Sequence, residues 1–147
     1  MIAENGVASD EEAIAIDSAH TLSLKSIAMT GEQIGRYRSR LDRLRSFGIS
    51  LFEEVAPSVD GPRQPTSDID GVLVMFIPPG TKQTADLNQL DKVARLSPKL
   101  PIAVDGGITR QIAQQCHDRG AGYLISGRDL FTTTRNNSPT TRERRSA

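Results

Sequence analysis

The chain has 147 residues, and its 18 lysines and arginines balance its 18 aspartates and glutamates, which gives a formal net charge of zero. A chain of this length can bury one sizeable hydrophobic core. Because the charges balance, no overall field attracts nucleic acid or a membrane surface. Aromatic residues make up only 4% of the chain and tryptophan is absent, so stacking platforms for single-stranded nucleic acid are not expected. The single cysteine, Cys116, excludes an internal disulfide framework.

The sequence carries no sign of export or membrane insertion. No apolar run approaches the roughly 20 residues that a membrane-spanning helix needs. The segment from Met1 to Asn5 lacks the basic start and apolar core of a signal peptide. We therefore expect a cytoplasmic protein with neither a membrane nor a nucleic acid as its partner.

The first predicted element is short. The apolar run of residues 13–16 is followed by His20 and predicts either a strand with His20 near its end or a short helix. A lone histidine is more often a surface residue or a satisfied core residue than a ligand. We therefore assign no role to His20.

An arginine-rich amphipathic helix is predicted over residues 31–47. Thr30 and Gln33 have the spacing of a capping box, and Gly48 supplies a stop. Arginines cover the faces beside the apolar stripe. They fit either a solvated outer face of the helix or a surface that binds nucleic acid. No interleaved aromatic residues support the nucleic-acid surface. The apolar residues are Ile34, Tyr37, Leu41, Leu44 and Phe47, and the arginines are Arg36, Arg38, Arg40, Arg43 and Arg45.

Two strands and a further helix are predicted next. Residues 49–57 read as a strand that Pro57 stops, and residues 58–68 read as a loop. The continuous apolar run of residues 72–77 is typical of a strand buried on both faces. Residues 86–89 can cap the next helix, which Pro98 ends, and its expected apolar side consists of Leu87, Leu90, Val93 and Ala94.

The most informative stretch predicts one βαβ unit. Residues 100–105 form a short apolar strand that ends in an acid, Asp105, and the two glycines Gly106 and Gly107 follow it. Thr109 is placed to cap a helix that Gly120 ends, and residues 123–126 form the next strand. A strand, a helix and a second strand imply a parallel pair. Chemistry in such units lies beyond the carboxyl ends of the strands, where Asp105 and the glycines stand.

Three blocks of this sequence together resemble the ribulose-phosphate 3-epimerase family. They are Asp70 to Gly80 with Gln83, then Val104 to Ile108, and then Gly120 to Gly127 with the Asp129-Leu130-Phe131 ending. The blocks occur in family order and at family spacing over roughly residues 69–131. The resemblance implies an α/β fold, the C-terminal portion of a (β/α)8 TIM-type barrel with about five βα units. We expect this partial barrel over residues 1–131 and a disordered polar tail over residues 132–147.

The resemblance also implies a reaction and a site. The reaction is epimerisation of a phosphorylated ketopentose, by proton removal and return at the third carbon through a metal-stabilised enediolate. Asp105 would be a catalytic acid or base and a ligand of a divalent metal cation. The residues that would bind phosphate or substrate are Met75, Gly80, Gly106, Gly107, Gly127 and Arg128.

The chain departs from the family pattern in one respect that bears on activity. The family carries a His-x-Asp pair and a further histidine on early strands, and this sequence has no His-x-Asp. Its nearest candidate, His117 with Asp118, lies within a predicted helix. One strand-end carboxylate cannot serve both faces of a carbon, so we expect the isolated chain to epimerise its substrate very slowly.

Two alternatives to an enzyme stay open. One is a non-catalytic remnant that binds a phosphosugar or phosphate, and the other is an interaction module that uses the arginine-rich helix of residues 31–47. About five strands cannot close an eight-stranded ring, and open sheet edges invite pairing. We therefore also expect copies of the chain to associate as a homo-oligomer.

Overall fold

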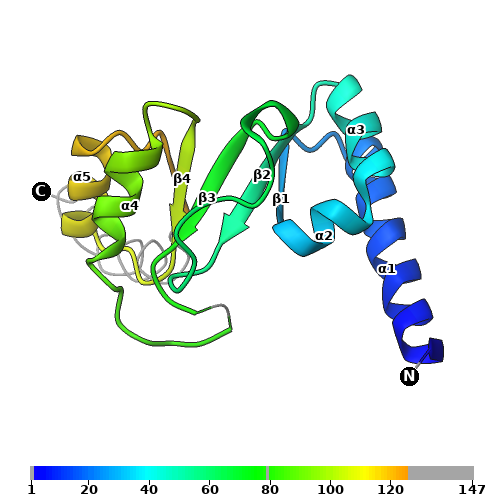
Figure 1. The fold of residues 1–147 in the computed structure, drawn as a ribbon, viewed down its shortest axis with the longest axis horizontal. Coiled ribbons are helices and arrows are strands. Elements are labelled where there is room, and N and C mark those ends of the chain that lie inside the picture. The colour runs from blue at the N-terminus through cyan, green and yellow to red at the C-terminus, as the bar shows by residue number, and fades with distance from the viewer. Residues whose placement is uncertain (1, 79, 126–147) are drawn as a thin grey trace, which may run out of the picture. The chain divides into compact units, whose positions relative to one another are not determined.

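The computed structural model describes residues 2–78 and 80–125 of the chain, with side chains from residue 11 onward. It has two compact units, one of residues 1–55 and 61–73 and one of residues 56–60 and 74–147. Five strands follow one another in the sheet in chain order, β1-β2-β3-β4-β5, with helices between them along the chain (Figure 1). Alternating strands and helices confirm the predicted α/β class.

The first unit contains a long helix followed by a parallel pair of strands. Helix α1 spans Ile2–Thr21, and strand β1, Ser26–Thr30, runs parallel to β2, Ser50–Val55. The register places Ser26 opposite Ser50 and Thr30 opposite Glu54. Two helices lie between these strands in the sequence, α2 over Gly31–Arg36 and α3 over Arg38–Ser46.

The strand alternative for residues 13–16 is wrong, because these residues lie inside α1. Ile16 and Ala19 face the core there, while Ile14 is exposed. The ring of His20 stacks on the ring of Phe47 with 4.0 Å between centroids. Since His20 contacts an aromatic side chain at the end of a helix, it occupies a structural position.

The helix predicted over residues 31–47 begins and ends as expected but is broken in the middle. The hydroxyl of Thr30 accepts a hydrogen bond from the Gln33 amide, and the Gln33 side chain accepts one from the Thr30 amide, which confirms the capping box. Tyr37, at φ −113° and ψ 28°, leaves helical geometry and separates α2 from α3. Gly48 follows α3 at φ +87°, as its predicted role requires. Phe47 was expected on the buried face and is instead 47% exposed.

Strand β3, Gly71–Met75, starts in the first unit and ends in the second. Every residue of this strand is buried, and so are Phe76 and Ile77 beyond it, which confirms the predicted two-sided burial. A β-carbon on Gly71 would overlap the ring of Phe52, so any larger residue at the start of this strand would force that ring to move. The loop before it contains one short turn of 3₁₀ helix, Thr66–Asp68.

The second unit continues with two helices and a second parallel pair of strands. Helix α4 spans Gln89–Leu96 and helix α5 spans Arg110–Asp118, and they lie next to each other beside β4 (Figure 1). Strand β4, Ile102–Asp105, pairs in parallel with β5, Tyr123–Ile125. The hydroxyl of Thr109 accepts a hydrogen bond from the Ile112 amide, so the predicted cap of α5 is confirmed.

Two details of α4 differ from expectation. Leu87 lies before the helix and is 51% exposed, and Ala94 faces outward, whereas Leu90, Val93 and Leu96 are buried. Asp86 stands three residues before the start of α4, and its carboxylate accepts hydrogen bonds from the Asn88 amide and the Gln89 side chain. The apolar stripe is therefore shifted toward the C-terminal end of the helix. None of the described helices is long and apolar enough to cross a membrane.

Candidate active site

The carboxyl ends of β3 and β4 meet at the backbone of Phe76. Its amide donates a hydrogen bond of 2.7 Å to the carbonyl of Asp105, and its carbonyl accepts one of 2.8 Å from the amide of Asp86. Three segments are thus tied together: the end of β3, the end of β4 and the approach to α4. Parallel α/β sheets place their reactive groups at this edge.

Asp105, the last residue of β4, carries the one acidic side chain among the predicted site residues. Its side chain is partly buried, and desolvation raises the pKa of the carboxyl group above its usual range. A hydrogen bond from the Gly106 amide opposes this effect and is the smaller influence. A carboxylate whose charged form is destabilised holds a proton more readily, which suits a group that takes up and returns protons.

The two glycines after Asp105 form a turn that other residues would strain. Gly106 has φ +107° and Gly107 has φ +65°, both in the region that favours glycine. A β-carbon on Gly106 would lie 2.9 Å from both Cγ1 and the amide nitrogen of Ile77. The backbone therefore passes directly against the end of β3. This close approach leaves no room for a side chain at residue 106.

Residues 13–131 match the model of the ribulose-phosphate 3 epimerase family. The chain belongs to the ribulose-phosphate 3-epimerase family. The match starts at residue 13, well before the stretch of roughly residues 69–131 that carries the sequence resemblance, and it includes the C-terminal part of α1, strand β1 and the arginine-rich helices.

Solved structures support the fold. Two structures of mutant tryptophan synthase alpha-subunit from the hyperthermophile Pyrococcus furiosus each align with a TM-score of 0.60 at 16% identity. They cover 92% and 91% of this chain, and the chain covers 57% of each of those proteins. At this identity the likeness shows the TIM-type barrel fold alone. The chain thus spans a little over half the length of these barrel proteins, which confirms the prediction of a partial barrel.

The structure brings some of the predicted epimerase-site residues together. Met75 ends β3, one residue before the Phe76 hydrogen bonds, and its side chain is 7% exposed. Gly80 lies farther along the chain at φ +79°, in a turn where the amide and hydroxyl of Thr81 both bond to the Pro78 carbonyl. Gly127 and Arg128 lie outside the described residues, as does the tail of residues 132–147. The phosphate and substrate roles of these residues stay predictions.

A divalent metal cation is expected from the family, with Asp105 as a ligand. Within residues 11–78 and 80–125, whose side chains the structure describes, no three histidine, cysteine, aspartate or glutamate side chains cluster closely enough to hold a metal ion. Asp105 offers a carboxylate, and hard divalent cations prefer several such oxygen ligands. The described residues do not by themselves fit a resident cation, so we assign it no step.

Two buried charged groups near the strand ends escaped the sequence analysis. Glu53 is 2% exposed, and its carboxylate accepts hydrogen bonds of 2.7 Å and 2.9 Å from the amides of Arg63 and Gln64. Lys92 is 7% exposed and donates to the carbonyls of Ala56 and Pro57. Each side chain secures the loop that follows β2, so each has a structural role. No local pattern marks them, because their partners are backbone groups 10 to 36 residues away.

The ion pairs of the arginine-rich helices count against the alternative that these helices form an interaction module. Four of the five arginines reach acidic side chains, and Arg45 makes hydrogen bonds of 3.0 Å with both carboxylate oxygens of Asp70. Burial opposes the charge of Asp70, yet the Arg45 pair and the Leu51 amide hold the pKa of that carboxyl below its usual range. The other pairs are Arg36 with Glu12 and Glu32, Arg38 with Asp42, and Arg40 with Asp17. Cations already neutralised by carboxylates are less able to bind phosphates.

Proposed function

We propose that this chain acts on a phosphorylated ketopentose as a ribulose-phosphate 3-epimerase-type isomerase, with Asp105 as one of its acid-base groups. The observation that carries the proposal is the environment of Asp105. It is a partly buried carboxyl group with a raised pKa, held at the end of β4 beside the Gly106–Gly107 turn, within the segment that matches the family.

The chemistry required of Asp105 is one proton transfer. Its carboxylate takes the proton from the sugar carbon next to the carbonyl, and the electron pair left behind moves to the carbonyl oxygen to give an enediolate. Return of a proton to the same face restores the substrate, whereas return to the opposite face gives the epimer. The proposal assigns Asp105 to one face and identifies no second group among the described residues.

Substrate binding is assigned to the neighbouring strand ends. Gly106 and Gly107 would let the main chain approach the phosphate, because glycine carries no side chain to hold an anion away and α5 begins just beyond. Gly127 and Arg128 would complete the phosphate site, with the arginine pairing directly with phosphate oxygens. Met75 and Gly80 would contact the sugar.

The test separates an enzyme from a phosphosugar-binding remnant. Ribulose 5-phosphate deuterated at its third carbon is incubated with the chain, and loss of deuterium to water and formation of xylulose 5-phosphate are followed separately by NMR. Asp105 acting alone gives deuterium loss without matching epimerisation, and Asp105→Asn abolishes the loss. Removing a general acid or base typically costs about 10²–10⁴-fold in rate. Binding with no deuterium loss at all would show the remnant in place of the enzyme.

A further inference from the structure

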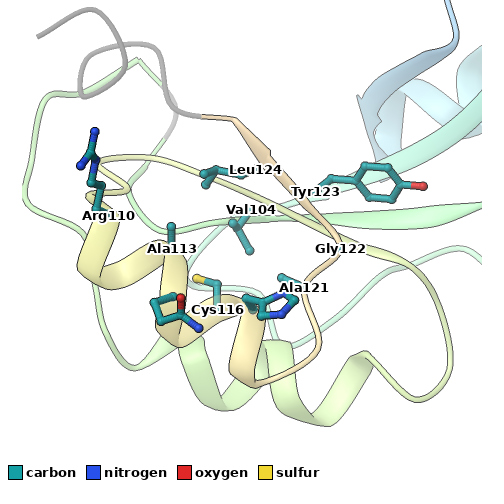
Figure 2. A pocket seen from close by; sticks show the side chains of 10 residues that line it. Val104, Arg110, Ala113, Cys116, Ala121, Gly122, Tyr123 and Leu124 are labelled. Carbon is teal, nitrogen blue, oxygen red and sulfur yellow. The ribbon is translucent and has the colours of Figure 1, made fainter. Parts of the chain in front are cut away.

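Helix α5 packs on the β4–β5 pair through short side chains and leaves a hollow between them. Val104 of β4 pairs with Leu124 of β5, so both side chains point to the same face of the two strands, and both line the hollow. On the opposite wall α5 contributes Ala113 and Cys116, and Cys116 is the one buried residue of this helix. Because an alanine and a cysteine are too short to fill the space, a cavity of about 460 Å³ results (Figure 2).

This α5 cavity is separate from the proposed active site. Val104 lines it, whereas Asp105, the next residue of β4, does not. Successive side chains of a strand point to opposite faces, so Asp105 and the α5 cavity lie on opposite sides of β4. What the α5 cavity binds is therefore independent of the proposed epimerase chemistry.

The floor of the α5 cavity is apolar and buried, and its mouth is open. Val104 and Cys116 are each 1% exposed and Ala121 is 8% exposed, whereas Leu124 is 50% exposed. An engineered apolar cavity of about 150 Å³ stays dry and binds benzene. The α5 cavity is roughly three times as large, so it has room for a longer apolar molecule with one end in water.

The polar groups of the α5 cavity favour negative charge. Arg110 opens α5 and lines the cavity, and within the described part of the chain it makes no ion pair. The imidazole of His117 and the amide of Gln114 also line it, and that amide donates a hydrogen bond to the carboxylate of Asp118. No acidic side chain is among the described residues that line the cavity. The N-terminal end of α5, where Arg110 stands, adds the positive end of the helix dipole.

We propose that the α5 cavity binds a small amphiphilic anion, a molecule with an apolar body and one carboxylate. The apolar body lies against Val104 and Cys116, and Arg110 contacts the carboxylate at the mouth. The volume argues for a small molecule over a partner helix. One turn of a helix with its side chains fills roughly 400–600 Å³, so the α5 cavity holds no more than about a single turn.

Titration with decanoate, followed by amide shifts of the isotopically labelled full chain, tests the proposal. Saturable shifts are expected at Ala113, Cys116 and Leu124. Decanol, which has the same chain without the charge, should bind about two- to fivefold more weakly, because an exposed charge contact contributes modestly. Arg110→Gln should remove this difference between the two probes and leave decanol binding unchanged.

Filling the α5 cavity from within gives the matched variants. Ala113→Phe should weaken decanoate about tenfold or more, and Ala113→Leu, which perturbs the fold less, should weaken it by a smaller factor. Ala94→Phe places the same ring on the exposed side of α4 in the same unit and should change nothing.

A thiol reagent supplies a second readout, because Cys116 lines the α5 cavity and the chain has no other cysteine. Decanoate should slow the reaction of Cys116 with methyl methanethiosulfonate in the parent and in Ala94→Phe. Absence of shifts at α5 and β5 in the parent would overturn the proposal, since another part of the chain or a second copy would then fill the cavity. Shifts centred on exposed apolar residues elsewhere, such as Leu22 and Leu24, would overturn it equally.

Discussion

Replacing Gly106 with alanine is a sharp test of how the end of β4 is built. The new β-carbon would lie 2.9 Å from two atoms of Ile77 and 3.2 Å from the amide nitrogen of Phe76. Two of these three atoms belong to the backbone, so the contact cannot be relieved by a side-chain rotation. The φ of +107° adds strain that only glycine avoids. Backbone strain costs about 1–3 kcal/mol and overpacking about 1–3 kcal/mol, so Gly106→Ala should lose about 2–6 kcal/mol of unfolding free energy.

Urea denaturation followed by circular dichroism measures this loss, and Gly122→Ala is the matched control. Gly122 also lies beside a strand of the second unit, but a β-carbon there would meet nothing within 4 Å. Since alanine reduces the freedom of the unfolded chain, this control should be neutral or stabilising by up to about 1 kcal/mol. Equal stabilities for the two variants would show that the backbone at Gly106 does not approach Ile77 as described.

Three further substitutions test the charged groups. Burial raises the Asp105 pKa, so above pH 3.8 the folded state binds more protons than the unfolded state and stability falls as pH rises. Asp105→Asn should therefore have a higher melting temperature than the parent at pH 7 and the same melting temperature at pH 3. A lower melting temperature of the variant at pH 7 would refute this. Glu53→Gln should cost about 1–3 kcal/mol in urea denaturation by losing an acceptor for a buried amide, whereas the exposed Glu32→Gln should cost under about 1 kcal/mol. Burial lowers the Lys92 pKa below 10.5, so the parent should gain stability as pH rises toward that value. Lys92→Met should lack this gain. Identical profiles of unfolding free energy against pH for the two proteins would contradict the buried position of Lys92.

Local sequence signals predicted the elements whose ends are set by neighbouring residues. Thr30 and Thr109 cap helices as expected, because a side-chain hydroxyl and an amide three residues later suffice for the cap. The buried run around β3 was equally clear, since a continuous apolar stretch fits burial on both faces.

Elements that depend on distant contacts were not predictable in the same way. Strand β1, Ser26–Thr30, has a single buried side chain, Met29, so no apolar pattern marks it, and its pairing with β2 defines it as a strand. The break at Tyr37 interrupts a continuous apolar pattern, and the nearest glycine, Gly35, still lies within α2, so the sequence does not mark the residue at which the helix ends. Similarly, Phe47 lies outside the buried face of α3, and its ring stacks on the ring of His20.

The identity of the candidate site residues was predictable from local sequence, whereas their environment was not. Asp105, Gly106 and Gly107 are adjacent in sequence, so an acid and two turn residues at the end of an apolar strand identified them. The contact of Gly106 with Ile77 and the burial that raises the Asp105 pKa depend on packing between β3 and β4. The sequence therefore predicts which residues stand at the strand end, while their strain and protonation follow from the tertiary structure.

The double hydrogen bond at Phe76 makes the position of Asp105 independent of any side chain at residue 76. Both bonds use main-chain atoms, one to the carbonyl of Asp105 and one from the amide of Asp86. Any residue other than proline at this position keeps the main-chain donor, whereas proline would remove it. The same linkage joins Phe76 to Asp86, so a single residue holds both the end of β4 and the approach to α4 through its main chain.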